Sequence, residues 1–296
     1  MLNKEKPVEV IFDIEKCTKC GICAKVCPCE YLLQVESEII TNPDAMFGCI
    51  QCGHCMAACP YKAIEIRGES LSKEHLIEFD AQKADYESLY SLLIQRRSAR
   101  KFKHQPVSQE DIEKILNAAS TGAISIPPYE VKIIVINGAD KVQKFADDLI
   151  DSFKKMTKVF NPFLLWLFKY IMSKNNYKLI KEFVIPLIKT TIEEKQLDHD
   201  ILFYNAPAVI LFYTTEICDK EDAIIAATLA MTAAETLGLG TCVIGSVPPA
   251  INQNSKLKAK YGLTKDEKVA TAFILGYPEQ TFYRGIKRDF KDVKWL

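Results

Sequence analysis

Apolar positions recur at helical spacing in three stretches from residue 86 onward. A helix is predicted to begin at Tyr86, with its apolar positions at Leu89, Leu92 and Leu93. Ser108 is predicted to cap a second helix, whose buried stripe comprises Ile112, Ile115, Leu116 and Ala119. The alanine-rich stretch 223–237 predicts a third, tightly packed helix.

Continuous apolar and β-branched runs in the same region predict four strands, at 131–137, 208–213, 241–244 and 269–275. Because the run 131–137 has no polar alternation, we expect it to be a strand buried on both faces. Two shorter strands are predicted near the N-terminus, at 8–12 and 63–66. The region after residue 68 exceeds 200 residues and can bury a core of its own.

Length and charge narrow the classes of protein to consider. At 296 residues the chain exceeds the usual size of one domain, so two domains are expected. Lys plus Arg equals Asp plus Glu, 38 of each, so no global field favours nucleic acid or membrane. The first twelve residues contain no apolar run of signal-peptide length. We therefore expect a reducing, cytoplasmic location without disulfides.

The most apolar stretch is 160–172, which also contains Asn161, Pro162 and Lys169. A membrane-spanning helix needs about 20 apolar residues, so no stable membrane insertion is expected. We interpret the stretch as a buried or amphipathic helix. Contact with a membrane surface is the alternative interpretation.

Eight of the eleven cysteines form one pattern that occurs twice, with an offset of 32 residues. Pro28 and Pro60 directly follow the two runs, and Gly21 and Gly53 occupy the same position within each. This spacing is typical of chains that hold two 4Fe–4S clusters, for which thiolates are the preferred ligands. The cysteines are Cys17, Cys20, Cys23 and Cys27 in the first run, and Cys49, Cys52, Cys55 and Cys59 in the second.

In this arrangement the fourth cysteine of each run ligates the other cluster. The expected ligand sets are therefore Cys17, Cys20, Cys23 and Cys59 for cluster 1, and Cys49, Cys52, Cys55 and Cys27 for cluster 2. A zinc site is the rival interpretation, but structural zinc sites usually pair two Cys-x-x-Cys units across a longer gap. Cys29, a ninth cysteine, is expected either to pack or to have a ligand-exchange or redox role.

Residues 1–68 resemble bacterial two-cluster ferredoxins, and residues 69–85 are expected to be a linker. The resemblance implies that the first domain transfers electrons one at a time. Oxygen-sensitive clusters of this kind suggest an anaerobic organism.

Four of the seven residues in the run 96–102, RRSARKF, are cationic and follow the first predicted helix. One interpretation is a solvated helix terminus, favoured by the helix dipole. The other is a phosphate-binding segment, because arginine binds phosphate in a bidentate way and Ser98 adds a hydroxyl group.

Four motifs in a fixed order make residues 86–296 resemble the FMN-dependent nitroreductase family. They are the run at 96–102, NAP at 205–207, LGLGTCVIG at 237–245 and LGYP at 275–278. The resemblance implies an α+β fold around a mostly antiparallel sheet, with FMN at the interface of a homodimer. It supports the phosphate-binding interpretation of the arginine run.

The resemblance also implies which residues contact the flavin. Those expected near the FMN phosphate are Arg96, Arg97, Ser98, Arg100, Lys287 and Arg288. The backbone of Ile244, Gly245 and Ser246 is expected near the reactive edge of the flavin. No catalytic side chain is expected, because the flavin itself performs the chemistry.

Two features depart from the family pattern. Ser125 stands where an asparagine usually contacts the flavin, and Pro127 stands where glutamine is usual. Ser125 is expected either to donate a hydrogen bond to the flavin or to be a plain loop residue. Residues 151–200 form an aromatic-rich helical insertion, expected either to pack or wrap the dimer, or to cover the flavin pocket as a lid.

The two parts together predict an FMN-dependent oxidoreductase. Its expected donor is reduced ferredoxin or NAD(P)H, and its expected acceptor is a small organic molecule such as a nitroaromatic, a quinone or an activated alkene. No Gly-x-Gly-x-x-Gly motif follows a strand, which argues against a separate dinucleotide domain. An electron carrier for a protein partner, or a redox sensor, remains an alternative function.

Overall fold

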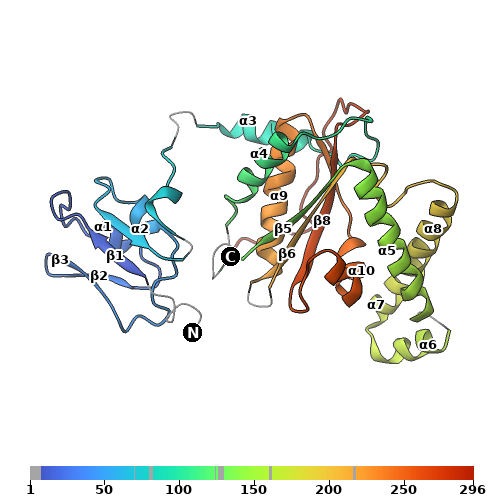
Figure 1. Cartoon of the computed structure of the whole chain (residues 1–296), viewed down its shortest axis with the longest axis horizontal. Coiled ribbons are helices and arrows are strands. Elements are labelled where there is room, and N and C mark those ends of the chain that lie inside the picture. The colour runs from blue at the N-terminus through green and yellow to red at the C-terminus, as the bar shows by residue number, and fades with distance from the viewer. Residues whose placement is uncertain are drawn as a thin grey trace. The chain divides into compact units, whose positions relative to one another are not determined.

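The computed structural model describes residues 8–69, 71–79, 83–123, 125, 130–159, 162–215 and 218–296. The chain divides into two compact units, one built from residues up to Lys83 and the other from Ala84–Ala123 and Val131–Leu296 (Figure 1). None of the helices within the described ranges has the length and apolar character needed to cross a membrane.

The first unit is built from four short strands and two single-turn helices. Strand β1 (Glu9–Phe12) pairs antiparallel with β4 (Ile64–Arg67), and β2 (Leu32–Val35) with β3 (Glu38–Thr41). Helices α1 (Ile22–Lys25) and α2 (His54–Ala57) follow the glycines of the two cysteine runs, and a 3₁₀ turn, η1, covers Lys73–His75. The apolar core is small, comprising Leu32, Cys55, Met56, Ile64, Ile66 and Leu71.

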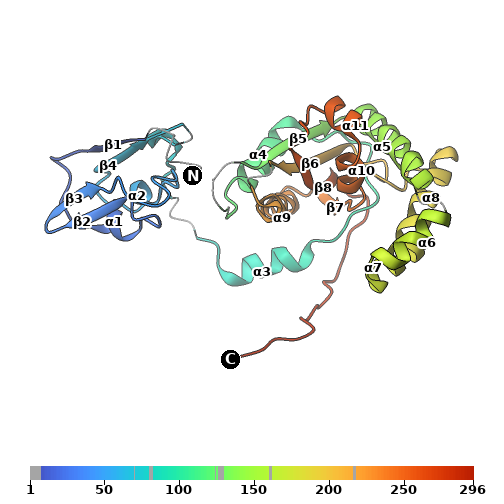
Figure 2. The same cartoon turned by 90° about the horizontal axis from the view of Figure 1, so that it is seen from below.

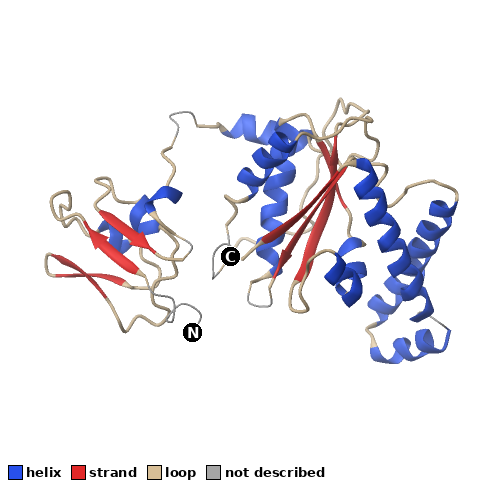
Figure 3. Ribbon diagram, in the orientation of Figure 1, coloured by secondary structure: helices blue, strands red, loops and turns tan. Residues whose placement is uncertain are grey.

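The second unit is organised around one antiparallel sheet with the strand order β5-β6-β8-β7. The strands are β5 (Lys132–Asn137), β6 (Ala208–Thr214), β7 (Gly240–Val243) and β8 (Lys268–Gly276). Figure 3 shows the strands between helices on both faces. The expected α+β architecture around a mostly antiparallel sheet is therefore present.

Strand β6 connects the two halves of the core because its side chains alternate between the faces of the sheet. Val209 and Leu211 pack with helix α5 (Ala139–Val159) and with α10 (Val247–Asn252). On the other face, its buried residues pack with the alanine stripe of α9 (Lys220–Thr236) and with α4 (Gln109–Ala119); they are Ala208, Ile210 and Phe212. A further short helix, α11, covers Ser255–Lys260.

Strand β5 corrects the expectation that 131–137 is buried on both faces. It lies at one edge of the sheet, with β7 at the other, and the side chains of Lys132 and Val135 are exposed. An apolar run cannot distinguish a central strand from an edge strand, because strand order is set by pairing partners distant in sequence.

Helix α3 (Tyr86–Gln95) forms where the apolar spacing predicts it. None of its residues is buried, however, and Leu89 and Leu93 are each 48% exposed. The helix predicted from the apolar spacing is therefore confirmed. Its apolar side chains Leu89 and Leu93, however, are not covered by the described residues of this chain.

The insertion forms a group of helices beyond α5 (Figure 2). Helices α6 (Pro162–Ile171) and α7 (Lys174–Leu179) lead into a π-helical turn, η2 (Ile180–Val184), and then into α8 (Ile185–Gln196), which packs against α5. A π-helical turn inside a helix is uncommon and occurs often at functional sites.

A substitution at Gly276 tests the close packing at the end of β8. A Cβ atom there would lie 2.6 Å from Cδ of Pro207 and 2.8 Å from Cδ1 of Phe102. We expect Gly276→Ala to destabilise the second unit by about 1–3 kcal/mol, as overpacking of a core does, measured by thermal unfolding. The control is Gly245→Ala, since a Cβ atom at Gly245 meets nothing within 4 Å. Both variants are compared in ligand-free protein, because Gly245 is one of the residues expected to contact the flavin. Equal unfolding temperatures for the two variants would contradict this packing.

Candidate cluster and cofactor sites

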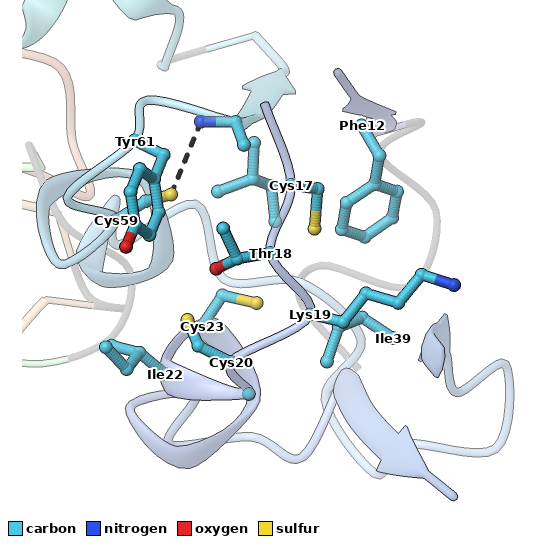
Figure 4. Close-up of a pocket in the computed structure, with 13 residues that line it drawn as sticks. Phe12, Cys17, Thr18, Lys19, Cys20, Ile22, Cys23, Ile39, Cys59 and Tyr61 are labelled. Carbon is cyan, nitrogen blue, oxygen red and sulfur yellow. Dashed lines mark hydrogen bonds between the residues drawn. The ribbon is translucent and has the colours of Figure 1, made fainter. Parts of the chain in front are cut away.

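The first cysteine cavity lies between the two cysteine runs of the first unit. Its lining includes Cys17, Cys20 and Cys23 from the first run and Cys59 from the second. Figure 4 shows their sulfur atoms around one space, together with the apolar side chains of Phe12 and Ile39. The structure therefore brings together the four cysteines expected to hold cluster 1.

The second cysteine cavity is lined by Cys49, Cys52 and Cys55 together with Cys27 from the first run. The four cysteines expected for cluster 2 thus also lie around one space. Cys29 lines the same cavity. Within the described ranges, no group of three or more Cys, His, Asp or Glu residues is arranged to hold a single metal ion.

The backbone conformation repeats with the same offset of 32 residues as the cysteines. Gly21 and Gly53 have φ angles of 75° and 76°, and Lys19 and Gln51 both have a φ of 55°. Left-handed conformations at these positions turn the chain tightly around each cavity. A side chain at Gly21 would also collide with Gln34, because an added Cβ would lie 2.0 Å from its Oε1.

Burial keeps several of the cavity thiols protonated in the absence of a cation. It raises the pKa of Cys55 to about 12, and it also raises the pKa values of Cys23 and Cys49. A metal ligand must be a thiolate, so a cation that binds here has to displace these protons. Iron meets this requirement and is stabilised by soft thiolate ligands.

In the second unit, the arginine run lies along the edge of the sheet. Ser98 forms a parallel bridge with Thr241 of β7, and the backbone N–H of Ala99 donates to the carbonyl oxygen of Thr241 at 3.0 Å. The approach is close because position 240 is glycine, where a Cβ atom would lie 2.6 Å from that of Ala99. Pairing with β7 therefore fixes the position of the arginine run, residues 96–102, at Ser98 and Ala99.

A cavity of about 540 Å³ opens beside this edge, within the usual size range of small-molecule sites. Its lining includes Arg100 and the segment Ile244–Gly245–Ser246. Four of the residues expected to contact FMN therefore line one cavity. Gly245 leaves room for a ligand, since no atom lies within 4 Å of the place where its Cβ would be.

Tyr204 also lines this cavity and was not expected from the sequence. Its ring centre lies 5.9 Å from the guanidinium carbon of Arg100, a cation–π distance. The buried carboxylate of Asp200 holds this loop by accepting the backbone N–H groups of Leu202, Phe203 and Asn205 at 2.9–3.0 Å. In the sequence, the NAP motif at 205–207 directly follows Tyr204, and this motif was the feature that could have indicated Tyr204 as a site residue.

The insertion supplies a large part of the cavity lining. Phe183 and Val184 come from η2, and Leu187, Ile188 and Thr191 come from α8. The lining also includes Phe153 and Met156 of α5. The insertion therefore shapes the pocket, as the lid interpretation requires.

Arg97 provides a buried polar atom that needs a partner. Its Nη1 donates to the carbonyl oxygen of Arg96 at 2.6 Å, while its Nη2 is buried without a hydrogen-bond partner among the described residues. Nearby, burial raises the pKa of Glu235, an effect that Arg96 and Arg97 only partly offset. A buried guanidinium N–H without a partner is costly, so this position suits an anionic ligand.

The other expected residues do not line the cavity. Arg96, Arg97 and Ser98 are absent from its lining, although they directly precede Ala99 and Arg100 in the run. Lys287 and Arg288 belong to an exposed C-terminal segment and do not line the cavity. Ser125 is exposed and does not line it either. Pro127 lies outside the described residues.

Comparison with known families places both units. Residues 93–277 match the model of the nitroreductase family, and residues 16–64 match a 4Fe–4S dicluster domain. The chain belongs to the nitroreductase family. The predicted order, a ferredoxin-like domain followed by a nitroreductase domain, is confirmed. The prediction that the chain is an oxidoreductase of this family is also confirmed.

Solved structures share the nitroreductase fold. A nitroreductase with bound FMN from Bacteroides fragilis is 14% identical, with a TM-score of 0.53 over 71% of this chain and 98% of that chain. A nitroreductase with bound FMN from Desulfitobacterium hafniense is 16% identical, with a TM-score of 0.52 over 70% of this chain and 97% of that chain. At this identity the similarity establishes the fold, and it confirms the α+β class.

Substitution of the two neighbouring cysteines tests which of them is a ligand. We expect Cys27→Ala to lose about half of the bound iron, because one of two clusters loses a thiolate. Cys29→Ala should retain its iron, since the four-cysteine set is complete without it. Iron and sulfide assays on anaerobically purified variants measure the difference. Equal losses in both variants would mean that Cys29 is also a ligand.

Proposed function

We propose that this nitroreductase-family protein binds two 4Fe–4S clusters and one FMN, and reduces a small organic acceptor with electrons from a low-potential donor. The observation that carries the proposal is the presence in one chain of two kinds of site. The first unit has two cavities lined by cysteine thiols. The second unit has a cavity whose lining includes both Arg100 and Ile244–Ser246.

Two clusters are supported by two separate cavities, each of which takes cysteines from both runs. The shared ligands tie the runs together, so neither half of the repeat completes a site alone. Because the buried apolar cluster of the first unit comprises six residues within the described ranges, we propose that this unit depends on its metal for much of its stability.

FMN is supported by three features of the second unit. Arg97 offers a buried N–H group to an anion, Arg100 lines the cavity, and Gly245 leaves space against the backbone. When bound, FMN accepts electrons singly and delivers them singly or as a hydride. We propose that Arg96, Arg97, Ser98 and Arg100 hold its phosphate and that the backbone of Ile244–Ser246 faces its ring.

An enzyme is favoured over a carrier because the insertion encloses one side of the cavity. A carrier for a protein partner needs an exposed flavin edge, whereas Phe183, Leu187 and Phe153 form an apolar wall here. Such a wall excludes water and favours an acceptor with an apolar, planar body. Nitroaromatics, quinones and activated alkenes all fit this description.

A homodimer is supported by apolar surface that this chain does not cover. Helix α3 exposes Tyr86, Leu89 and Leu93, and the segment after Tyr277 extends from the unit without helix or strand (Figure 2). That segment exposes Phe282, Tyr283, Ile286, Phe290 and Trp295. We propose that it wraps a second copy, and that Lys287 and Arg288 reach the partner subunit's FMN phosphate.

Substitution of one ligand from each run tests the electron path. In Cys20→Ser and Cys52→Ser, reduction of FMN by reduced ferredoxin should fall to the background rate. Cys218→Ser is the control, because Cys218 is buried in the second unit beside Asp222, outside both cysteine cavities. Photochemical reduction of the flavin should remain equal in all three variants. Unchanged ferredoxin-driven reduction in the cluster variants would refute the proposal.

A further inference from the structure

Charge is distributed very unevenly between the insertion and the rest of the chain. Residues 154–189 contain eight lysines and one acidic residue, Glu182, which gives a net charge of +7. Because the whole chain is balanced at 38 charges of each sign, the remainder carries −7. A neutral protein thus presents one strongly cationic region, which attracts anionic partners.

The same segment exposes large apolar side chains. They belong to four consecutive helical elements, α6, α7, η2 and α8, which form one group beyond α5 (Figures 1 and 2). Each is between 42% and 69% exposed: Trp166, Tyr170, Ile171, Leu179, Phe183 and Leu187. Apolar side chains that gather on neighbouring elements usually mark an interaction surface.

All eight lysines of the segment are exposed. Lys154 pairs with Asp151 at 3.0 Å and Lys178 with Glu182 at 3.8 Å. Both pairs are exposed, and exposed pairs cancel little of the long-range field. The cationic groups are therefore accessible beside the apolar ones.

We propose that this lysine-rich apolar surface, residues 154–189, docks on the surface of an anionic lipid bilayer. Trp166 and Tyr170 are of the residue types that concentrate at the membrane–water boundary. Aliphatic groups such as Ile171 and Leu179 can enter the acyl boundary while the lysines contact headgroups. The cationic charge adds attraction to each anionic lipid near the surface.

Charge and side-chain type favour a bilayer over other occupants. A second copy that docked through the same surface in a symmetric dimer would place two regions of +7 against each other. Nucleic acid would satisfy the charge and could stack on Trp166, but it offers no apolar phase for Ile171 and Leu179. The surface lies on the membrane rather than across it, since no described helix is able to span a bilayer.

The pocket wall and the docking surface overlap. Phe183 and Leu187 line the cavity and are also exposed, at 59% and 42%. The proposed contact with lipid therefore includes the rim of the cavity. Docking does not require FMN or an acceptor, so it can be tested independently of the proposed function.

Tryptophan fluorescence tests the proposal, because the chain has only two tryptophans, Trp166 and Trp295. The Trp295→Phe holoprotein reports Trp166 alone. We expect its emission to shift to shorter wavelength with vesicles of phosphatidylcholine and phosphatidylglycerol at low salt, and the protein to sediment with them. Phosphatidylcholine vesicles alone, or high salt, should abolish both effects. No shift with anionic vesicles, or an equal shift with neutral ones, would overturn the proposal.

A matched pair of charge variants separates local from general attraction. Lys174→Glu/Lys178→Glu/Lys181→Glu should weaken vesicle binding by about tenfold or more, since each lysine adds attraction to anionic headgroups. The control Lys141→Glu/Lys220→Glu/Lys265→Glu carries the same charge change on exposed lysines outside the surface and should bind as the parent does. Equal weakening in both would overturn the proposal. Binding of the parent protein to single-stranded RNA but not to vesicles would also overturn it. The same holds if the first variant loses a dimer that the parent forms while its vesicle binding is unchanged.

Discussion

The structure of the first unit is organised by thiols from both halves of a repeat, which lie around the same two cavities. Cys59 completes the set begun by Cys17, and Cys27 completes the set begun by Cys49. Burial raises the pKa values of Cys55 and Cys49, so a cation is needed to stabilise these two groups as thiolates. In the proposed function, the metal both holds the small first unit together and carries its electrons.

In the proposed function, the second unit supplies the destination for those electrons, and its cofactor site is organised by one edge of the sheet. Strand β7 fixes the arginine run by pairing with Ser98, and glycine at position 240 allows the close approach. The chain that leaves β7 lines the cavity at Ile244–Ser246, and the insertion supplies a large part of the lining. A widely shared fold thus acquires its own pocket from one inserted segment.

The local conformations could be predicted from the sequence where a short-range rule determines them. The cysteine repeat predicts which four cysteines line each cavity, the cap at Ser108 predicts the start of α4, and the apolar runs predict the four described strands of the sheet. Long-range pairing decides the rest. It makes β5 an edge strand, leaves Leu89 of α3 exposed, and brings Tyr204 beside Arg100. No spacing rule connects such distant positions.

The measurement that tests this account most directly is the cofactor content of the anaerobically purified full chain. Two cysteine cavities and one flavin cavity predict about eight iron, about eight sulfide and about one FMN per chain. Zinc in place of iron would contradict the account of the first unit. Iron without any FMN would leave the electrons without the destination that the second unit is proposed to provide.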